Sequence, residues 1–291
     1  MSGPGYARPG SVADTVATLQ SHPGARMIAG GTDLMVQMRL GHRSPELLVG
    51  TGALDELHRL EAGADDTHIG SAVTLREFLQ VRELVARHPA LAQAAHLLGG
   101  RQIQAVATFG GNICNASPAA ESTTPLLVYD AQAEIAGPQG RREIPLAELF
   151  EGPGRTTLGP GELLVALRLP GVGGDQRSAY RRMELRRSVD IAIVSASAWF
   201  QVVDGRVAEA RVAIGAVNAV ATRVPDAEEA LTGVDVSDRS AVATAIAEAA
   251  SSCRQASRPI DDTRASARYR AAMVEVISQR TMAEAIDQEN S

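Results

Sequence analysis

Cysteine is scarce in this chain of 291 residues, and histidine shows no ligand pattern. The two cysteines, Cys114 and Cys253, form no C-x-x-C pair, so this chain alone can build neither a zinc site nor an iron–sulfur cluster with four thiolates. The six histidines have no H-E-x-x-H spacing, and we expect each on the surface or on a helix. The sequence therefore predicts no metal site in this chain.

Long apolar runs and an excess of positive charge are also absent. No apolar run approaches the roughly 20 residues that span a bilayer, and the first residues lack the basic and apolar segments of a signal peptide. The net charge is −6 and aromatic residues are only 3% of the chain, which argues against a nucleic-acid surface. We therefore expect a cytoplasmic protein with no membrane span and no nucleic-acid partner.

Glycine, in contrast, is frequent, and two of its adjacent pairs, Gly30-Gly31 and Gly110-Gly111, stand eighty residues apart beside short polar side chains. Glycine allows a positive φ and lets several N–H groups turn toward one point, which suits phosphate or diphosphate oxygens. Neither pair belongs to the G-x-G-x-x-G of a Rossmann turn or the G-K-[ST] of a P-loop, which disfavours a kinase or a simple NAD-dependent dehydrogenase. We predict that both loops converge on one diphosphate held between small α/β lobes.

The order of predicted elements indicates an α+β chain. Short strands and helices alternate over the first seventy residues, and further strands are predicted at 133–136, 142–144 and 163–169. A Gly- and Pro-rich change of composition at 170–175 predicts a domain boundary. After it we expect strands at 178–183, 192–203 and 206–217, with a hairpin at Asp204-Gly205, and then helices at 227–231, 239–253 and 265–285. We therefore divide the chain into 1–174, with lobes at about 1–55 and 56–174, then 175–286 and a frayed tail at 287–291.

Seven segments of the chain form a recognisable set. They are A-G-G-T-D-L-M-V-Q-M-R at 29–39, T-F-G-G-N-I-C-N-A-S-P-A-A-E at 108–121, T-L-G-P-G-E-L-L at 157–164, L-R-L-P at 167–170, R-R-S-V-D-I-A at 186–192, A-I-G-A-V at 213–217 and D-D-T-R-A-S-A-R-Y-R at 261–270. Together they resemble the FAD-binding middle subunit of molybdenum hydroxylases, the family of carbon monoxide dehydrogenase, xanthine dehydrogenase and the bacterial dehydrogenases of aldehydes and N-heterocycles. The resemblance covers nearly the whole chain. It implies the two-lobed FAD-binding fold of vanillyl-alcohol oxidase and the enolpyruvate reductases, followed by a C-terminal α+β domain.

The resemblance also implies which residues hold FAD. The first diphosphate loop would be Met27, Ile28, Ala29, Gly30, Gly31, Thr32, Asp33 and Leu34, and the second Thr108, Phe109, Gly110, Gly111 and Asn112. Asn115, Ser117 and Glu121 match positions that bind the ribityl-phosphate and adenosine portions, although many relatives have Asp where Glu121 stands. Leu98 and Leu164 match apolar contacts, and Asp190 and Ile191 match the neighbourhood of the reactive flavin edge. Arg182, or Arg181 if the alignment shifts by one, matches a basic contact to the isoalloxazine ring that is usually Lys, and its alternative role is a salt bridge on the strand face.

The implied function is electron transfer within a larger oxidoreductase. FAD would accept electrons from [2Fe–2S] clusters on a small partner subunit, beside a large molybdopterin subunit that carries the substrate site, in a dimer of heterotrimers. The acceptor could be NAD⁺, a quinone, another carrier or oxygen, and the sequence selects none of them. The alternatives are a stand-alone FAD oxidase or reductase and a nucleotide-binding protein without redox activity. No residue of this chain is assigned a catalytic role, because no acid–base group or covalent flavin motif stands at a matched position.

Overall fold

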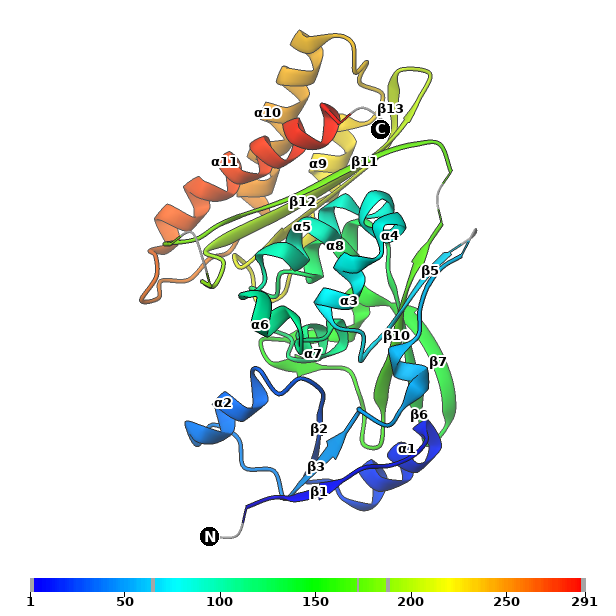
Figure 1. Ribbon diagram of the computed structural model, residues 1–291. Helices are drawn as coiled ribbons and strands as arrows, with labels where there is room; N and C mark the ends of the chain where they lie inside the picture. The colour runs from blue at the N-terminus through cyan, green and yellow to red at the C-terminus, as the bar shows by residue number, and fades with distance from the viewer. Residues whose placement is uncertain (1–2, 64–65, 172, 187–188, 289–291) are drawn as a thin grey trace.

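The structure, a computed structural model, describes residues 3–63, 66–171, 173–186 and 189–288. The first lobe, at the bottom of Figure 1, is a parallel sheet of order β1-β3-β2. Its elements are β1 (Gly5–Ala7), α1 (Val12–Ser21), β2 (Ala25–Ile28), α2 (Leu34–Arg39) and β3 (Leu47–Gly50). The Ser11 side chain begins α1 by accepting the N–H of Asp14 at 3.0 Å. The glycine loop of residues 29–33 therefore connects the end of β2 to α2.

The second lobe is an antiparallel sheet of order β4-β5-β10-β6-β7 with a layer of helices on one face (Figure 1). The strands are β4 (Leu60–Ala62), β5 (Asp66–Gly70), β6 (Gln132–Gly137), β7 (Gly140–Pro145) and β10 (Leu163–Pro170), with a small sheet of β8 (Phe150–Gly152) and β9 (Arg155–Thr156). The helices are α3 (Leu75–Gln80), α4 (Arg82–Arg87), α5 (Pro89–Leu97), α6 (Arg101–Gln104), α7 (Phe109–Cys114) and α8 (Thr123–Val128), with 3-10 turns η1 (Asp55–His58) and η2 (Leu146–Leu149). A core cluster fills the space between this sheet and its helices.

The C-terminal part is an antiparallel sheet of order β11-β12-β13-β14, with helices along its outer face (Figure 1). Its elements are β11 (Asp175–Met183), β12 (Val194–Val203), β13 (Arg206–Gly215), β14 (Thr222–Arg223), α9 (Pro225–Leu231), α10 (Arg239–Ala256) and α11 (Ala267–Ile286). The hairpin at Asp204-Gly205 has φ values of 51° and 76°, which a two-residue turn between twisted strands requires. The predicted hairpin is therefore confirmed.

Most predicted elements are confirmed, and the α+β class with them. Two predictions about secondary structure and histidine exposure are wrong. Residues 109–114 form helix α7 and are not an open loop, because the Thr108 side chain caps the N–H of Gly111 and Phe109 packs edge-on against Phe78 at 5.3 Å. His88 is neither on the surface nor within a helix, since it is 5% exposed at the junction of α4 and α5.

The sheet of the C-terminal part turns a polar face toward the second lobe. Alternate residues of β11 and β12 point to opposite sides, so the face that contacts α8 carries serines whereas the face under α10 and α11 carries alanines. The hydroxyl of Ser178 lies 2.6 Å from that of Tyr129, and Ser197 donates to Thr124 at 2.9 Å. We call this contact the polar seam. It fixes the register between the two parts by hydrogen bonds.

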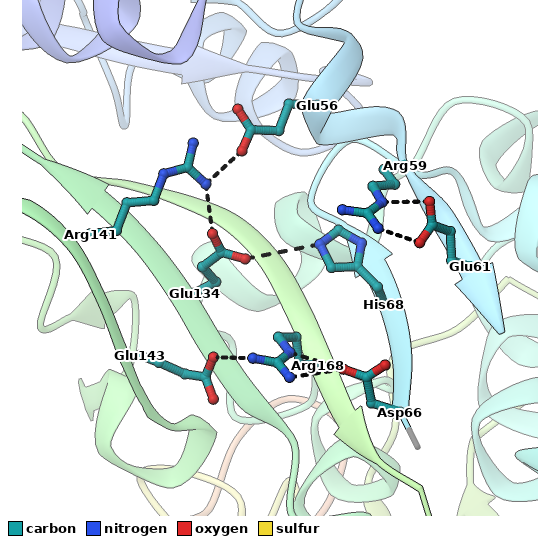
Figure 2. Close-up of polar contacts among 9 residues, drawn as sticks. All are labelled: Glu56, Arg59, Glu61, Asp66, His68, Glu134, Arg141, Glu143 and Arg168. Carbon is teal, nitrogen blue, oxygen red and sulfur yellow. Dashed lines mark hydrogen bonds and ion pairs between the residues drawn. The ribbon is translucent and has the colours of Figure 1, made fainter. Parts of the chain in front are cut away.

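The opposite face of the five-stranded sheet carries charges, which Figure 2 shows in close-up. We call it the charged face, and it consists of Glu56, Arg59, Glu61, Asp66, His68, Glu134, Arg141, Glu143 and Arg168. Ion pairs cross it from strand to strand and border a cavity of about 300 Å³. Within the described ranges, no three His, Cys, Asp or Glu side chains converge as a metal site requires. In the part of the chain that the structure describes, no helix is both long and apolar enough to cross a bilayer.

Candidate functional site

The two glycine segments meet in the structure. A Cβ atom on Gly30 would lie 1.8 Å from the carbonyl oxygen of Val106, so only glycine allows the first loop to approach the segment that leads into α7. Gln37 of α2 donates to Asn115 at 3.3 Å, which joins the other end of the loop to the end of α7. The convergence of residues eighty positions apart therefore comes from backbone packing.

The first loop presents a run of free backbone donors. The N–H groups from Ala29 to Leu34 have no acceptor among the residues that the structure describes, and the loop is only partly buried. Gly31 has a φ of +66°, a conformation that L side chains rarely adopt. Consecutive N–H groups that point into one concavity bind anions such as a diphosphate. The positive φ predicted for the first glycine pair is therefore confirmed at Gly31.

The second glycine pair works differently from the prediction. Gly110 and Gly111 do not have positive φ, and their N–H groups bond within the chain to the Ser71 carbonyl at 2.9 Å and the Thr108 hydroxyl at 3.0 Å. A Cβ on Gly110 would lie 2.5 Å from that Ser71 carbonyl oxygen, so this glycine is required for packing. Gly111 is exposed, and a Cβ there would meet only Thr108 Oγ1, at 3.0 Å. The second pair therefore offers a bare surface and no free N–H groups.

The turn after α7 carries the next polar groups. Asn112 accepts from the N–H of Ser122 at 3.3 Å and from its hydroxyl, which fixes the turn against α7. Ser117 accepts from the N–H of Ala119 at 3.3 Å, and Ala116 has a φ of 49°. Ser117 and Asn115 are partly exposed beside Gly111. This turn thus extends the bare surface with hydroxyl and amide groups.

Glu121 and Arg182 form a buried ion pair. Glu121 Oε1 lies 2.6 Å from Nη1 of Arg182, and Arg182 Nη2 lies 2.5 Å from a carboxylate oxygen of Glu184. Burial raises the pKa of Glu121, and Arg182 opposes that shift. The salt-bridge alternative for Arg182 is therefore present in the structure. Arg181, its neighbour, instead pairs with Glu284 of α11.

After β11, Val189 and Asp190 lie in the connection to β12, and Val189 lies close to the glycine turn before α6. Partial desolvation works against the ionised form of Asp190, but the N–H groups of Ile191, Arg186 and Leu185 lower its pKa. Val189 comes within contact distance of a Cβ built on Gly100. Leu185, Val189 and Ile191 are about half exposed, so this loop presents apolar side chains near the site.

Other candidate residues serve the core. Phe109 is fully buried and Leu164 is 4% exposed, both within the core cluster of the second lobe, and Leu98 packs against that cluster. Met27 packs against the core beneath the first lobe. Asp33, on the exposed side of the first loop, accepts from Gln37. The structure thus gathers the two glycine segments, the turn after α7 and Arg182, while Leu164 lies inside the core.

Sequence reasoning did not find several groups that shape the site. Val106 and Ser71 supply the carbonyl groups against which Gly30 and Gly110 pack, and a carbonyl group carries no residue-type signal. Tyr180 and Glu184 flank Arg182 at alternate positions of β11 and its end. The spacing Tyr180, Arg182, Glu184 could have indicated one polar strand face, because residues two apart share a face.

Comparisons with known proteins agree with this geometry. Residues 2–172 match the family model of the FAD binding domain in molybdopterin dehydrogenase, and residues 178–285 match that of the CO dehydrogenase flavoprotein C-terminal domain. The chain is 32% identical to the xanthine dehydrogenase FAD-binding subunit of Escherichia coli O157:H7 over 284 residues, covering 97% of this chain and 95% of that one. It is 29% identical to the nicotine 6-hydroxylase medium subunit of Paenarthrobacter nicotinovorans over 281 residues, with 96% of each chain covered.

Solved structures give the same result. A chain of reconstituted CO dehydrogenase from Oligotropha carboxidovorans superimposes with a TM-score of 0.93 at 27% identity, over 99% of both chains. A chain of carbon monoxide dehydrogenase from Hydrogenophaga pseudoflava, described as lacking the Mo-pyranopterin moiety of the molybdenum cofactor, gives 0.91 at 28% identity over 98% and 97%. These matches confirm the family resemblance of the present chain, which belongs to the FAD-binding medium subunits of the molybdenum hydroxylases.

Proposed function

We propose that this chain holds FAD between its two glycine segments and transfers electrons within a molybdenum hydroxylase complex. Electrons would come from [2Fe–2S] clusters on a small partner subunit and pass to NAD⁺, a quinone or another acceptor. The observation that carries the proposal is the run of N–H groups from Ala29 to Leu34, which have no acceptor among the described residues, together with the bare surface at Gly111. Such a cradle neutralises a diphosphate without a cationic side chain.

The residues of the chain divide the binding task. We propose that the first loop, Met27–Leu34, binds the diphosphate, that Thr108–Asn112 lie against it through Gly111, and that Asn115, Ser117 and Glu121 lie along the remainder. Leu98, Arg182, Asp190 and Ile191 would border the ring, and Leu164 would support it from the core. Arg182, 2% exposed, would place positive charge near the ring from a fixed position. FAD itself supplies the electron-transfer chemistry, and the protein supplies position, exclusion of water and electrostatics.

The proposal extends to the assembly. We propose that residues 1–174 form the FAD-binding unit and 175–286 the C-terminal domain, in a cytoplasmic dimer of heterotrimers with a small [2Fe–2S] subunit and a large molybdopterin subunit. The family supports this assembly, since a chain that superimposes on the present chain comes from a molybdenum enzyme. Purification with native partners, followed by metal analysis, checks it. Molybdenum and iron should elute only with the larger and smaller chains, whereas turnover of an organic substrate by this chain alone would favour the stand-alone enzyme.

Gly111→Val is the sharpest test of the cofactor site. Inside the chain the new side chain would meet only Thr108 Oγ1, so the free energy of unfolding of the apo chain should change by about 1 kcal/mol or less. Toward the ligand, it would occupy the bare surface, and FAD should be lost. FAD content after acid release and urea unfolding of the apo chain are the two measurements. Stoichiometric FAD in Gly111→Val would contradict the site.

Gly173→Val is the matched control. Gly173 is exposed, has no positive φ, and nothing lies within 4 Å of a Cβ built there. It lies on the connection between β10 and β11. This variant should keep full FAD content. If both variants lost FAD, the loss in Gly111→Val would reflect the addition of a side chain in general and not its position at the cofactor site.

A further inference from the structure

Beside the turn that follows α7 lies a buried group of ionisable side chains, to whose protonation the proposed function assigns no role. We call it the Glu121 cluster, and it consists of Glu121, Tyr180, Arg182 and Glu184. Glu121 precedes Ser122, whose N–H and hydroxyl bond to Asn112 of α7. The cluster therefore adjoins α7 and includes Glu121, which the proposed function places along the cofactor.

The charges of the cluster do not balance. Two carboxylates face one guanidinium, with side-chain exposures of 11% for Glu121, 2% for Arg182 and 18% for Glu184. Among the described residues, Tyr180, which is 2% exposed, is the other titratable group that faces these three side chains. Ser195 is a neutral neighbour. With both carboxylates ionised the cluster has a net charge of −1. A buried net charge is costly, and binding one proton removes it.

Several atoms of the cluster also lack partners. Among the described residues, Arg182 Nε is buried without a hydrogen-bond partner, and the buried Tyr180 hydroxyl has only the Ser195 side chain beside it. Glu184 Oε2 pairs with Arg182 by distance but not with hydrogen-bond alignment. Buried donors are almost always satisfied in folded proteins. These donors are suited to a further hydrogen-bond acceptor, whereas the two carboxylates that share the Arg182 guanidinium are the groups to which a proton can bind.

We propose that the Glu121 cluster is a proton-accepting site coupled to the charge of the neighbouring cofactor, with Glu121 as the carboxylate that binds the proton. The step is the reversible binding of one proton from solvent to the Glu121 carboxylate, and no other bond forms or breaks. Added negative charge nearby raises the proton affinity of a carboxylate. Electrons that reach the cofactor from a partner subunit therefore favour proton uptake here. Glu121 acts through Arg182 and is a positioning residue.

The direction of the Glu121 shift agrees with this. Burial raises its pKa, and the charge of Glu184 adds to that effect while Arg182 opposes it. Because the folded pKa lies above the unfolded value, Glu121 contributes stability at low pH that is lost as the pH rises through the folded pKa. Removal of that carboxylate should therefore alter the apo chain as well as the loaded one.

The experiment measures the midpoint potential of bound FAD against pH in the complete complex. The wild-type plot should show an inflection above the pH at which an exposed glutamate titrates, and Glu121→Gln should lack it. Glu184→Gln, which removes the repelling charge, should move the inflection to lower pH. Identical plots for wild type and Glu121→Gln, or an inflection that Glu184→Gln leaves in place, would overturn the proposal.

A control and a second readout separate this proposal from the proposed function on which it rests. Glu143→Gln removes a half-exposed carboxylate of the charged face and should keep the wild-type plot (Figure 2). If Glu121→Gln does not retain FAD, the second readout is urea unfolding of the apo chain at several pH values. As the pH rises, the free energy of unfolding should fall less in the variant than in wild type. An equal dependence of the free energy of unfolding on pH in both would overturn the proposal. Wild-type protein without FAD would instead contradict the proposed function.

Discussion

At the scale of single residues, His88 makes stability depend on pH. Its Nε2 lies 2.9 Å from Thr67 Oγ1, and its ring packs edge-on against Tyr129 at 4.9 Å. Burial, with a smaller contribution from the charge of Arg87, lowers the pKa of His88 to about 3. An unfolded histidine titrates near pH ~6.5. The unfolded chain therefore binds the proton more tightly, and the contribution of His88 is complete above that pH and is lost as the pH falls toward 3.

His88→Gln tests this directly. The variant should have a lower urea midpoint than wild type near neutral pH, because it loses the fitted ring, but its midpoint should fall less between about pH 7.5 and pH 5. His96→Gln, at an exposed position of α5, is the control, and its urea midpoint should depend on pH as that of wild type does. Equal slopes for wild type and His88→Gln would show that His88 does not carry the pH dependence.

Sequence reasoning accounts for the backbone conformation of some of these residues but not for the contacts of others. Gly30 and Gly31 could be assigned from their pattern, since a positive φ at Gly31 is a local property. The role of Gly110 could not, because its N–H bonds to Ser71, a residue distant in sequence. The burial of Glu121 against Arg182 depends on how β11 docks on the second lobe, and no local pattern encodes that distance.

At the scale of secondary-structure elements, the charged face holds η1 against two strands. Arg141 of β7 lies 2.5 Å from Glu56 of η1 and 2.6 Å from Glu134 of β6 (Figure 2). The hydrogen bond from Arg141 lowers the pKa of Glu56. Because this folded pKa lies below the unfolded one, the stabilisation is present above about pH 4.5 and is lost as the pH falls through the folded pKa.

Arg141→Ala should therefore destabilise the chain modestly. These side chains are up to half exposed, so the expected cost is about 1 kcal/mol at low salt, and screening should reduce it in about 0.5 M NaCl. Urea unfolding at both salt concentrations is the measurement. Arg59→Ala removes an exposed pair with Glu61, two residues away, and should cost less. A larger loss in Arg59→Ala would contradict the bridging role of Arg141.

The elements themselves show why some could be predicted and α7 could not. Strands β12 and β13 are long runs rich in apolar residues and are joined by Asp204-Gly205, and both features are local signals. In α7, two adjacent glycines disfavour a helix by roughly 1 kcal/mol each. The Thr108 cap and the bond from the N–H of Phe109 to the carbonyl of Val73 offset that preference. Tertiary structure thus overrides the local preference at the site.

At the scale of the whole molecule, the polar seam decides how the C-terminal part docks on the second lobe. Asp130, which follows α8, lies 2.9 Å from Arg211 and 2.5 Å from Arg223, both on the C-terminal sheet. The Arg211 guanidinium also stacks over the ring of Trp199, with 4.4 Å between its central carbon and the ring centroid. One carboxylate therefore pairs with two arginines across the seam, and a change at this position reaches both parts.

Asp130→Asn tests whether the seam couples the two parts. Asparagine tolerates the φ of 51° at this position, so the turn is kept while the charge is removed. Arg211, only 12% exposed, would keep Glu209 but lose the carboxylate across the seam, and we expect a loss of about 1–2 kcal/mol. Calorimetry should show a broader transition, because the parts become less tightly coupled. Asp235→Asn removes a pair with Arg206 inside the C-terminal part and should leave the width unchanged. Equal broadening in both variants would mean that the coupling does not pass through Asp130.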